Sequence, residues 1–229
     1  MSLRLFSVNR NVEISAGKTG TETPRLLITG AILAGGRSRR LGQDKARLKL
    51  SGKPLALWVA QRLAPLAADL WLVTNTPLDH LDLGLSILSD LAPDQGPLGG
   101  VRTALFYSRT PWVLAASVDN PFLSTDLLAA LAGRAGKTRR SAVVYVSDRG
   151  LEPFPGLYHV RLLQRLTDYL QKRLHVRPFL EQIRPEIVPA KEFPGPQPQA
   201  GFLFNLNTPE DLRRAEAWLA SRHHSPVKI

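Results

Sequence analysis

The sequence LLITGAILAGGRSRRLGQDKARL, residues 26–48, contains the turn that decides the fold. Leu26–Leu33 is a short apolar run with β-branched residues, which predicts a buried strand. The run ends in Gly35-Gly36, and glycines let backbone N–H groups come close to a ligand because no Cβ stands in the way. Exposed amides and concentrated positive charge favour a polyphosphate ligand. A basic, solvated turn between a strand and a helix is the alternative, although such a turn would not need the glycine pair. Only one acidic residue, Asp44, accompanies the basic residues that follow the glycines, which are Arg37, Arg39, Arg40, Lys45 and Arg47.

Two common glycine motifs for phosphate binding are absent. A Walker A loop has four residues between its glycines and a Lys directly after the second one. Here five residues separate Gly36 from Gly42, and Lys45 stands three positions after Gly42. The other candidate, Gly17-Lys18-Thr19, has Val12 where the first glycine belongs. The dinucleotide pattern G-x-G-x-x-G is also missing, because the two glycines after the strand are adjacent. The sequence therefore supports neither a P-loop NTPase nor an NAD enzyme.

The pattern L-x-G-G-x-S-x-R-hydrophobic-G-x-D-K resembles the molybdenum cofactor guanylyltransferase (MobA) family of nucleotidyltransferases. Leu41 stands where that family usually has Met, a substitution that conserves volume. The resemblance covers about residues 26–219. It implies an α/β fold with a Rossmann-like, doubly wound, mostly parallel sheet in three layers, as in nucleotide-diphospho-sugar transferases. The matching residues are Leu33, Gly35, Gly36, Ser38, Arg40, Gly42, Asp44 and Lys45.

Length and composition suit one enzyme domain in a reducing compartment. The chain has 229 residues and is 44% hydrophobic, enough for the core of one α/β domain. We expect residues 1–24 to be a flexible N-terminal extension and residues 25–229 to form a single nucleotidyltransferase domain. No run approaches the ~18 apolar residues of a membrane span. The chain has no cysteine and no signal-peptide pattern, so a cytoplasmic location is expected.

The net charge of +11 raises the question of nucleic-acid binding. The densest basic cluster, residues 37–53, contains no aromatic residue on which a base could stack. The chain also shows no helix-turn-helix, zinc or RNA-binding signature. We therefore expect no membrane and no specific nucleic-acid partner. Non-specific nucleic-acid binding stays an alternative, and the salt dependence of any DNA binding would test it.

Strand and helix patterns alternate from Arg25 onward, as in a parallel, doubly wound sheet. Residues 161–187 look helical but are interrupted by Pro178 and Pro185. Residues 96–100 are predicted to be a glycine-rich loop before a helix. Thr208 and Pro209 predict the start of the last helix. The other predicted strands cover residues 70–74, 85–88, 112–116 and 142–146, and the other predicted helices cover residues 54–66, 101–107 and 127–132, the last capped by Ser124.

Asp119 follows the apolar strand predicted over residues 112–116. An acid at the carboxyl end of such a strand lies where open α/β sheets bind ligands. In the resembled family this position supplies a carboxylate to Mg²⁺, and a lone Asp suits Mg²⁺, which also takes phosphate oxygens and water. Asn120 replaces the family's usual Met at the next position. The alternative is that Asp119 only caps the turn into Pro121.

The resemblance also implies further contacts with the nucleotide. Asp90 matches an acid that follows the third strand of the family, and Asn75 matches an Asn near the guanine base. The alignment could equally assign Thr74 to that place, and the glycine-rich loop after Asp90 could be purely structural. The implied nucleotide-binding residues are Leu33, Ala34, Gly35, Gly36, Lys45, Asn75, Asp90 and Asp119.

Two segments resemble the family's acceptor side. Residues 205–209 match its N-x-N-T-P motif, and Asn205 and Asn207 share one side of an extended segment. There they could hydrogen-bond the pterin or its phosphate, or they could only bond locally within a turn. Residues 152–158 resemble an E-P-L-x-A-L-Y strand. His159 directly follows this segment. The other four histidines show no spacing with acidic residues that is typical of a metal site, and they are His80, His175, His223 and His224.

The resemblance implies transfer of GMP from GTP to the terminal phosphate of molybdopterin, with or without molybdenum, which gives the guanine dinucleotide cofactor and pyrophosphate. The acceptor phosphate is already ionised, so catalysis rests on positioning and charge neutralisation. Lys45, Arg40 and Asp119 are the expected catalytic residues, with Asp119 as the Mg²⁺ ligand. Transient contact with proteins that deliver molybdopterin or receive the product is compatible with this activity.

Three other functions stay open at the level of sequence. A molybdopterin cytidylyltransferase of the same fold should show L-A-A-G where this chain has Gly35-Gly36, so the second glycine favours guanine. A sugar-phosphate nucleotidyltransferase should have a longer acceptor region after Asp119. A nucleotide-binding module without catalysis would not need both Lys45 and Asp119.

Overall fold

The computed structural model describes residues 28–35, 44–147, 150–189 and 205–223. Its centre is strand β1 (Ile28–Leu33), whose six residues are all buried. On one side β1 pairs in parallel with β4 (Asp69–Thr74), and on the other with β6 (Trp112–Ser117). A strand buried on both faces reads as a continuous apolar run, which is why these three strands are recognisable in the sequence. The extension predicted over residues 1–24 lies outside the described residues.

The main sheet has seven strands in the order β5-β4-β1-β6-β8-β7-β9. From β1 the chain moves outward to β4 and β5 and then crosses back to β6 on the other side of β1, so a topological switch point lies between β1 and β6. Strand β8 is antiparallel to both of its neighbours, while β9 runs parallel to β7. The predicted doubly wound, mostly parallel sheet is therefore confirmed. The remaining strands are β5 (Ser86–Ser89), β7 (Ala142–Ser147), β8 (Gly150–His159), β9 (Glu186–Pro189) and the small hairpin of β2 (Lys49–Leu50) and β3 (Lys53–Pro54).

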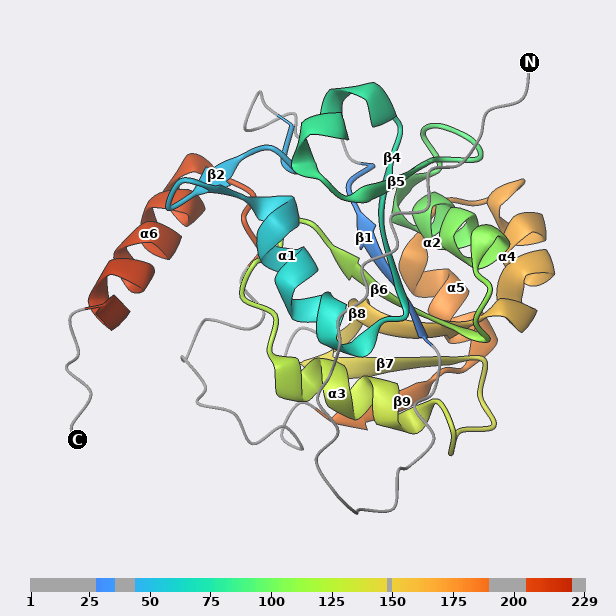
Figure 1. Ribbon diagram of the computed structural model, residues 1–229. Coiled ribbons are helices and arrows are strands. Elements are labelled where there is room, and N and C mark those ends of the chain that lie inside the picture. Colours follow the sequence, from blue (N-terminus) through green and yellow to red (C-terminus); the bar gives the residue numbers. More distant parts are fainter. Residues whose placement is uncertain (1–27, 36–43, 148–149, 190–204, 224–229) are drawn as a thin grey trace, which may run out of the picture.

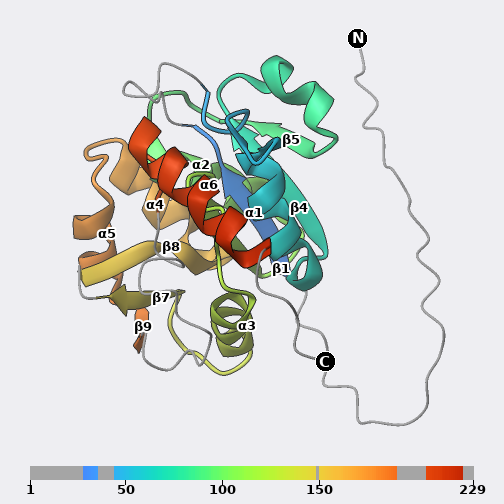
Figure 2. The same cartoon turned by 90° about the vertical axis from the view of Figure 1, so that its left-hand side faces the viewer.

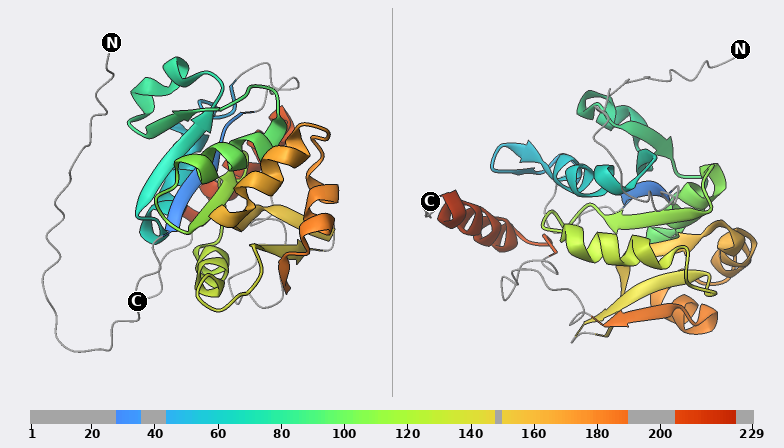
Figure 3. Two further views of the ribbon diagram at one scale, coloured as in Figure 1. Left: turned by 90° about the vertical axis from the view of Figure 1, so that its right-hand side faces the viewer. Right: turned by 60° about the horizontal axis from the view of Figure 1, so that its bottom comes forward.

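Helices cover both faces of the sheet and give three layers (Figures 1 and 3). Successive side chains of a strand point to opposite faces, so Ile32 lies in one apolar core and Leu33 in the other. One face carries α1 (Leu55–Leu63), α3 (Thr125–Arg134) and α6 (Pro209–His223), and the other carries α2 (Gly96–Tyr107), α4 (Leu163–Leu170) and α5 (Val176–Ile183). Short 3₁₀ segments are η1 (Ala64–Leu66), η2 (Pro77–Leu83) and η3 (Val160–Leu162). No described helix combines the length and the apolar character that crossing a membrane requires.

Helix α2 begins five residues earlier than the sequence pattern predicts. Residues 96–100, predicted as a loop, form the first turns of this helix. A Cβ at Gly99 would lie 2.8 Å from Cβ of Gln95, and a Cβ at Gly100 would lie 3.0 Å from Cδ2 of Leu33. These two glycines therefore allow close packing inside the fold, whereas the sequence pattern predicts that they belong to a loop.

The segment predicted as one interrupted helix, residues 161–187, is several elements. Pro178 lies in the first turn of α5, where a missing N–H breaks no intrahelical bond. Arg184 ends α5 in the left-handed conformation with φ 49°, and Pro185 leads into β9. Ile187 therefore belongs to a strand.

Both helix starts that rest on capping residues are confirmed. The Ser124 side chain accepts a hydrogen bond from the backbone N of Leu127 at the start of α3. At the start of α6, the backbone N of Asp211 donates to Oγ1 of Thr208 at 3.1 Å. Figure 2 shows α6 lying along the α1 side of the molecule, and α6 also contacts β2.

Two glycines provide a matched test of packing. A Cβ at Gly156 in β8 would overlap the carbonyl oxygen of Pro153 and lie 2.9 Å from Cε2 of Tyr158, whereas a Cβ at Gly133 in α3 meets nothing within 4 Å. We expect Gly156→Ala to lower the free energy of unfolding by about 1–3 kcal/mol, as overpacking does. Gly133→Ala should raise it by up to about 1 kcal/mol, because Ala favours helix. Denaturant unfolding would check both, and equal effects of the two changes would contradict this account.

Candidate active site

The carboxyl ends of four neighbouring parallel strands meet at one edge of the sheet. Gly35 follows β1, Asn75 follows β4, Asp90 follows β5 and Asp119 follows β6. Two of these ends are tied together by the backbone, because the N–H of Val118 donates to the carbonyl of Leu33 at 3.1 Å. This edge, at the switch point between β1 and β6, is where open α/β sheets bind ligands.

Three of the predicted nucleotide-binding residues converge beside β1. A Cβ at Gly35 would lie 2.9 Å from Oδ2 of Asp90 and 3.7 Å from Nδ2 of Asn75. Any side chain at residue 35 would therefore fill the space in front of Asp90. Oδ1 of Asn75 is buried and has no hydrogen-bond partner within the described ranges. The site thus presents a carboxylate acceptor and an amide donor at a position kept open by a glycine.

Asp90 is supported by helix α2, which packs against the same edge. Oγ1 of Thr103 lies 3.1 Å from Oδ1 of Asp90, and the backbone N of Leu91 donates to the same hydroxyl at 3.1 Å. Burial raises the pKa of Asp90 above its ordinary value, although the Thr103 hydroxyl and the nearby charge of Arg102 oppose this shift. A partly buried carboxylate with few partners favours a ligand that brings hydrogen-bond donors. The sequence pattern did not single out Thr103, because a helical Thr carries no signal for a partner 13 residues away.

Lys45 contacts two other predicted site residues at this edge of the sheet. Its Nζ lies 3.2 Å from Oδ2 of Asp119 and donates to Oδ1 of Asn207 at 2.7 Å. The side chains of Lys45 and Asp119 are each 17% exposed, so this ion pair is only partly screened by water. The structure therefore brings together three predicted residues that come from distant parts of the chain.

Asp119 has one oxygen engaged and one open. While Oδ2 faces Lys45, Oδ1 is buried and has no hydrogen-bond partner in the part of the chain that the structure describes. A buried carboxylate oxygen without a donor fits a hard divalent cation. Among the described residues, no group of three or more His, Cys, Asp or Glu side chains is placed so that it could hold a metal ion. A metal here would therefore depend on this one carboxylate and on oxygens brought by the substrate.

The turn that carries Lys45 is fixed by a buried histidine. Oδ1 of Asp44 accepts from the backbone N of Ala46 at 2.8 Å, and its Oδ2 lies 2.5 Å from Nε2 of His80. Nδ1 of His80, which is 1% exposed, lies 2.8 Å from the carbonyl oxygen of Thr76 and so carries a hydrogen. His80 thus links the end of β4 to the Lys45 turn. The sequence shows no sign of this link, because Asp44 and His80 meet only in the folded chain.

Arg47, one of the basic residues expected to attract a polyphosphate, instead pairs with groups of the protein itself. Its guanidinium donates to Oδ2 of Asp82 at 2.9 Å and to the backbone carbonyl of Asp79. The hydrogen bond with Asp82 raises the pKa of Arg47 and lowers that of Asp82. Both side chains are exposed, so the pair contributes little to stability. Its effect is to attach η2 to the Lys45 turn.

The structure describes some of the other predicted site residues but not all of them. Leu33 points into the core, so β1 meets a ligand through its backbone at this point. Ala34 donates its N–H to the carbonyl of Val73 at 2.9 Å. Asn205 is exposed and, among the described residues, forms no hydrogen bond to Lys45 or Asp119. Gly36 and Arg40 lie outside the described residues, so their roles stay predictions.

Comparison with known proteins agrees with this geometry. Residues 30–187 match the model of the MobA-like NTP transferase domain. The chain is 36% identical over 190 residues to the molybdenum cofactor guanylyltransferase of Yersinia pseudotuberculosis serotype O:1b (strain IP 31758), covering 80% of this chain and 92% of that protein. The protein of the same name from Yersinia pestis matches with the same identity and coverage.

Solved structures share the fold. The molybdopterin-guanine dinucleotide biosynthesis protein A of Archaeoglobus fulgidus superposes with a TM-score of 0.74 at 26% identity, over 84% of this chain and 99% of that one. The 4-diphosphocytidyl-2C-methyl-D-erythritol synthase of Anaerococcus prevotii DSM 20548 covers 85% of this chain and 96% of its own, with a TM-score of 0.60 but only 14% identity, which shows the fold alone. Sheet order, site geometry and these matches agree: the chain belongs to the MobA-like NTP transferase family and is a nucleotidyltransferase.

Proposed function

We propose that the protein transfers GMP from GTP to the terminal phosphate of molybdopterin, forming the guanine dinucleotide cofactor and pyrophosphate. The observation that carries this proposal is the Lys45 ammonium between Asp119 and Asn207, at the edge where the four parallel strands end. The names of the relatives that are 36% identical to this chain support guanine as the base and molybdopterin as the acceptor.

The base side of the site favours guanine. A guanine edge presents an N1–H and an exocyclic amino group side by side, and both are donors. In the space next to Gly35, Asp90 offers a carboxylate oxygen as acceptor and Asn75 offers its amide nitrogen as donor. The carboxylate suits the two guanine donors, and the amide nitrogen suits the guanine carbonyl oxygen. Cytosine presents one amino donor beside two acceptors, so the Asp90 carboxylate would meet one donor in place of two and the affinity would be lower. Molybdopterin cytidylyltransferase is therefore the alternative, and a GTP/CTP competition assay separates the two.

The phosphate side acts by positioning and charge. A Lys ammonium has three N–H donors, and within the described ranges Asp119 and Asn207 take two of those of Lys45. The third is left for a phosphate oxygen. The proposed roles of the Gly35 and Gly36 amides and of Arg40 are to hold the rest of the triphosphate. The attacking phosphate is already ionised, so no side chain has to remove a proton in this step.

Asp119 is the proposed ligand of Mg²⁺. Its Oδ1 is buried and open, while Oδ2 is already neutralised by Lys45. Asp119 would hold a Mg²⁺ ion through Oδ1, and the ion would supply positive charge that neutralises charge developing on the phosphates. The two oxygens of Asp119 therefore serve two cations, and Lys45 keeps the carboxylate from turning away from the site.

Asn205 and Asn207 are proposed to meet the acceptor. Leu206 between them is fully buried, so the two Asn side chains are directed away from the core and both residues are exposed. Oδ1 of Asn207 is occupied by Lys45, which leaves its amide nitrogen as a donor for the acceptor phosphate. We also propose a cytoplasmic location, where GTP is available, and transient contact with proteins that deliver the pterin or receive the dinucleotide.

Replacing Lys45 should abolish most of the chemistry without unfolding the protein. We expect Lys45→Ala to lower kcat by about 10²–10³-fold, because a charge aimed at the transition state is lost. Pyrophosphate release with GTP, Mg²⁺ and molybdopterin would measure it. Lys49→Ala, at an exposed position in β2, is the matched control and should keep kcat. Normal turnover by Lys45→Ala would refute its role, and an inactive wild type would favour a module that only binds nucleotide.

The metal assignment predicts an altered Mg²⁺ requirement. Asp119→Asn keeps the shape but replaces one oxygen by an NH₂ group, so kcat should fall by about tenfold or more and saturation should need more Mg²⁺. Titration of activity with Mg²⁺ would show this shift. Asp126→Asn, at an exposed position in the first turn of α3, is the control. Asp119 would not be the metal ligand if its variant kept the wild-type Mg²⁺ curve.

Asp90→Asn should weaken GTP binding and leave stability equal or higher. The change replaces one acceptor by a donor, which should raise KM for GTP by about 10–100-fold. Burial raises the folded-state pKa of Asp90, so the ionised carboxylate opposes folding at neutral pH. That opposition disappears as pH falls through the raised pKa toward the ordinary value of 3.8. An amide has no such cost.

Steady-state kinetics with GTP and CTP, together with thermal unfolding, would check both parts of this expectation. Asp94→Asn, at an exposed position in the same loop with φ 60°, is the control, since Asn tolerates that conformation. An Asp90→Asn protein with wild-type KM for GTP, or with a clearly lower melting temperature, would contradict the assignment.

A further inference from the structure

We infer that Asp211, in the first turn of α6, is a positioning residue for the transfer step, which acts through Asn207 on the ammonium of Lys45. The inference rests on the role of Lys45 in the proposed function. It gives Asp211 a role in the reaction in addition to its role in capping the start of α6.

The carboxylate of Asp211 fixes the backbone next to the site. Its Oδ2 accepts from the backbone N of Asn207 at 3.0 Å and from the backbone N of Thr208 at 2.8 Å. Thr208 returns the interaction, because its Oγ1 accepts from the backbone N of Asp211. An ordinary capping box ties the third helical residue to the cap itself. Here the carboxylate also holds the residue before the cap, whose side chain touches Lys45.

The Asp211 carboxylate is ionised at neutral pH, so it can accept the two backbone hydrogen bonds at all times. Burial alone would raise its pKa, but the hydrogen bonds from Asn207 and Thr208, together with the charge of Arg214, outweigh burial and lower the pKa below its ordinary value. The carboxylate therefore stays ionised at neutral pH and accepts both backbone hydrogen bonds. A charge-assisted hydrogen bond of this kind is shorter and stronger than one between neutral groups.

Asn207 is held from both sides along the chain. The residue before it, Leu206, is fully buried, and its backbone N donates to the carbonyl of Asp119 at 2.8 Å. Asp211 holds Asn207 itself and the residue after it. The backbone that carries the Asn207 side chain is thus tied directly to Asp119, the other partner of Lys45. These backbone contacts fix the distance between Oδ2 of Asp119 and Oδ1 of Asn207, the two oxygens that contact the Lys45 ammonium.

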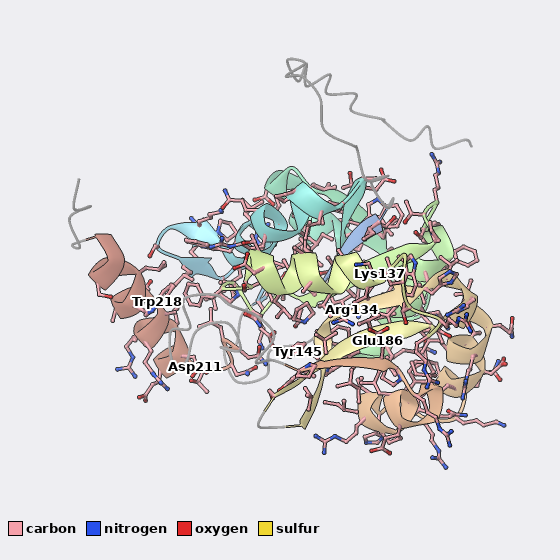
Figure 4. All side chains as sticks on the ribbon, turned by 90° about the horizontal axis from the view of Figure 1, so that it is seen from below. Arg134, Lys137, Tyr145, Glu186, Asp211 and Trp218 are labelled. Carbon is pink, nitrogen blue, oxygen red and sulfur yellow. The ribbon has the colours of Figure 1, made fainter. Side chains whose placement is uncertain are left out.

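The far part of α6 is attached to the same loop. The rings of Trp218 and Phe122 pack edge to face, with centroids 4.6 Å apart, and Phe122 comes three residues after Asp119. Phe122 in turn packs against Trp58 of α1. Figure 4 labels Asp211 and Trp218, which lie along α6. Helix α6 therefore has contacts to the Asp119 loop both at its start and further along its length.

Lys45 needs this second anchor because of its own chemistry. A Lys side chain is long, has many rotamers and ends in a compact charge, so one carboxylate sets its distance but not its direction. A second acceptor on a fixed backbone sets the direction, and the third N–H then points to one place. Loss of Asp211 would free Asn207, so the ammonium would follow Asp119 alone. This affects the transition state more than the binding of GTP.

The first test compares two acids of one helical turn in the full-length protein. Asp211→Ala should lower kcat by about tenfold, as a small misplacement of a catalytic group does, while KM for GTP stays near the wild-type value. Asp211→Glu should restore most of kcat, because Glu is the usual partner in a capping box. Glu210→Ala removes the same charge from the same turn at an exposed position and should keep kcat. Equal losses in Asp211→Ala and Glu210→Ala would overturn the inference.

A double-mutant cycle tests the route through Asn207. If Asp211 acts through Asn207, adding Asp211→Ala to Asn207→Ala should cause no further loss of kcat. Losses that multiply would show that Asp211 acts elsewhere and would overturn the inference. Thermal unfolding of each variant identifies any loss that comes from unfolded protein.

A measurement without the acceptor separates this inference from the proposed function. The rate at which acetic anhydride acetylates Lys45, followed by peptide mass spectrometry, reports how firmly its ammonium is held. It should be several-fold faster in Asp211→Ala and unchanged in Glu210→Ala. An unchanged rate in Asp211→Ala overturns the inference even if the wild type makes the dinucleotide. A wild type that makes no dinucleotide counts against the proposed function, and the acetylation rate still decides the inference.

Discussion

The placement of one ammonium group between a carboxylate and an amide is the constraint on which the active-site edge depends. Lys45, Asp119 and Asn207 come from a turn, a strand end and a helix start, and they meet only if the sheet and α6 are both correctly placed. A partly buried charge that loses one partner is costly, so the three segments support one another. The central strands and the last helix therefore share a single functional requirement.

The two carboxylates of this edge have different surroundings and hence different uses. Asp119 faces Lys45 with one oxygen and leaves the other open, which suits cations. Asp90 lies beside Thr103, and partial burial raises its pKa, which suits neutral hydrogen-bond donors. In the proposed function, the same type of side chain serves metal binding at one strand end and base recognition at another, because environment decides what a carboxylate can bind.

Features with local causes could be predicted from the sequence, and features with distant causes could not. Strands β1, β4 and β6 carry their own apolar runs, and Thr208 with Asp211 forms a cap within four residues, so both were predictable. The start of α2 was missed because the reason for Gly100 is its contact with Leu33 in the folded sheet. The link between His80 and Asp44 was missed for the same reason. Resemblance to a family indicated Lys45, Asp119 and Asn207 as site residues, but only the folded chain shows the Lys45 ammonium between the other two.

The buried ring of His80 has a consequence for any attempt to change the enzyme's choice of nucleotide. It spans from the carbonyl of Thr76, directly after Asn75, to the carboxylate of Asp44, directly before Lys45. A redesigned base pocket that shifts the main chain after β4 would therefore pull on the lysine as well. In the proposed function, the choice of base and the rate of transfer are therefore connected through His80. Retargeting it to another base would call for compensating changes around η2, at some distance from the base itself.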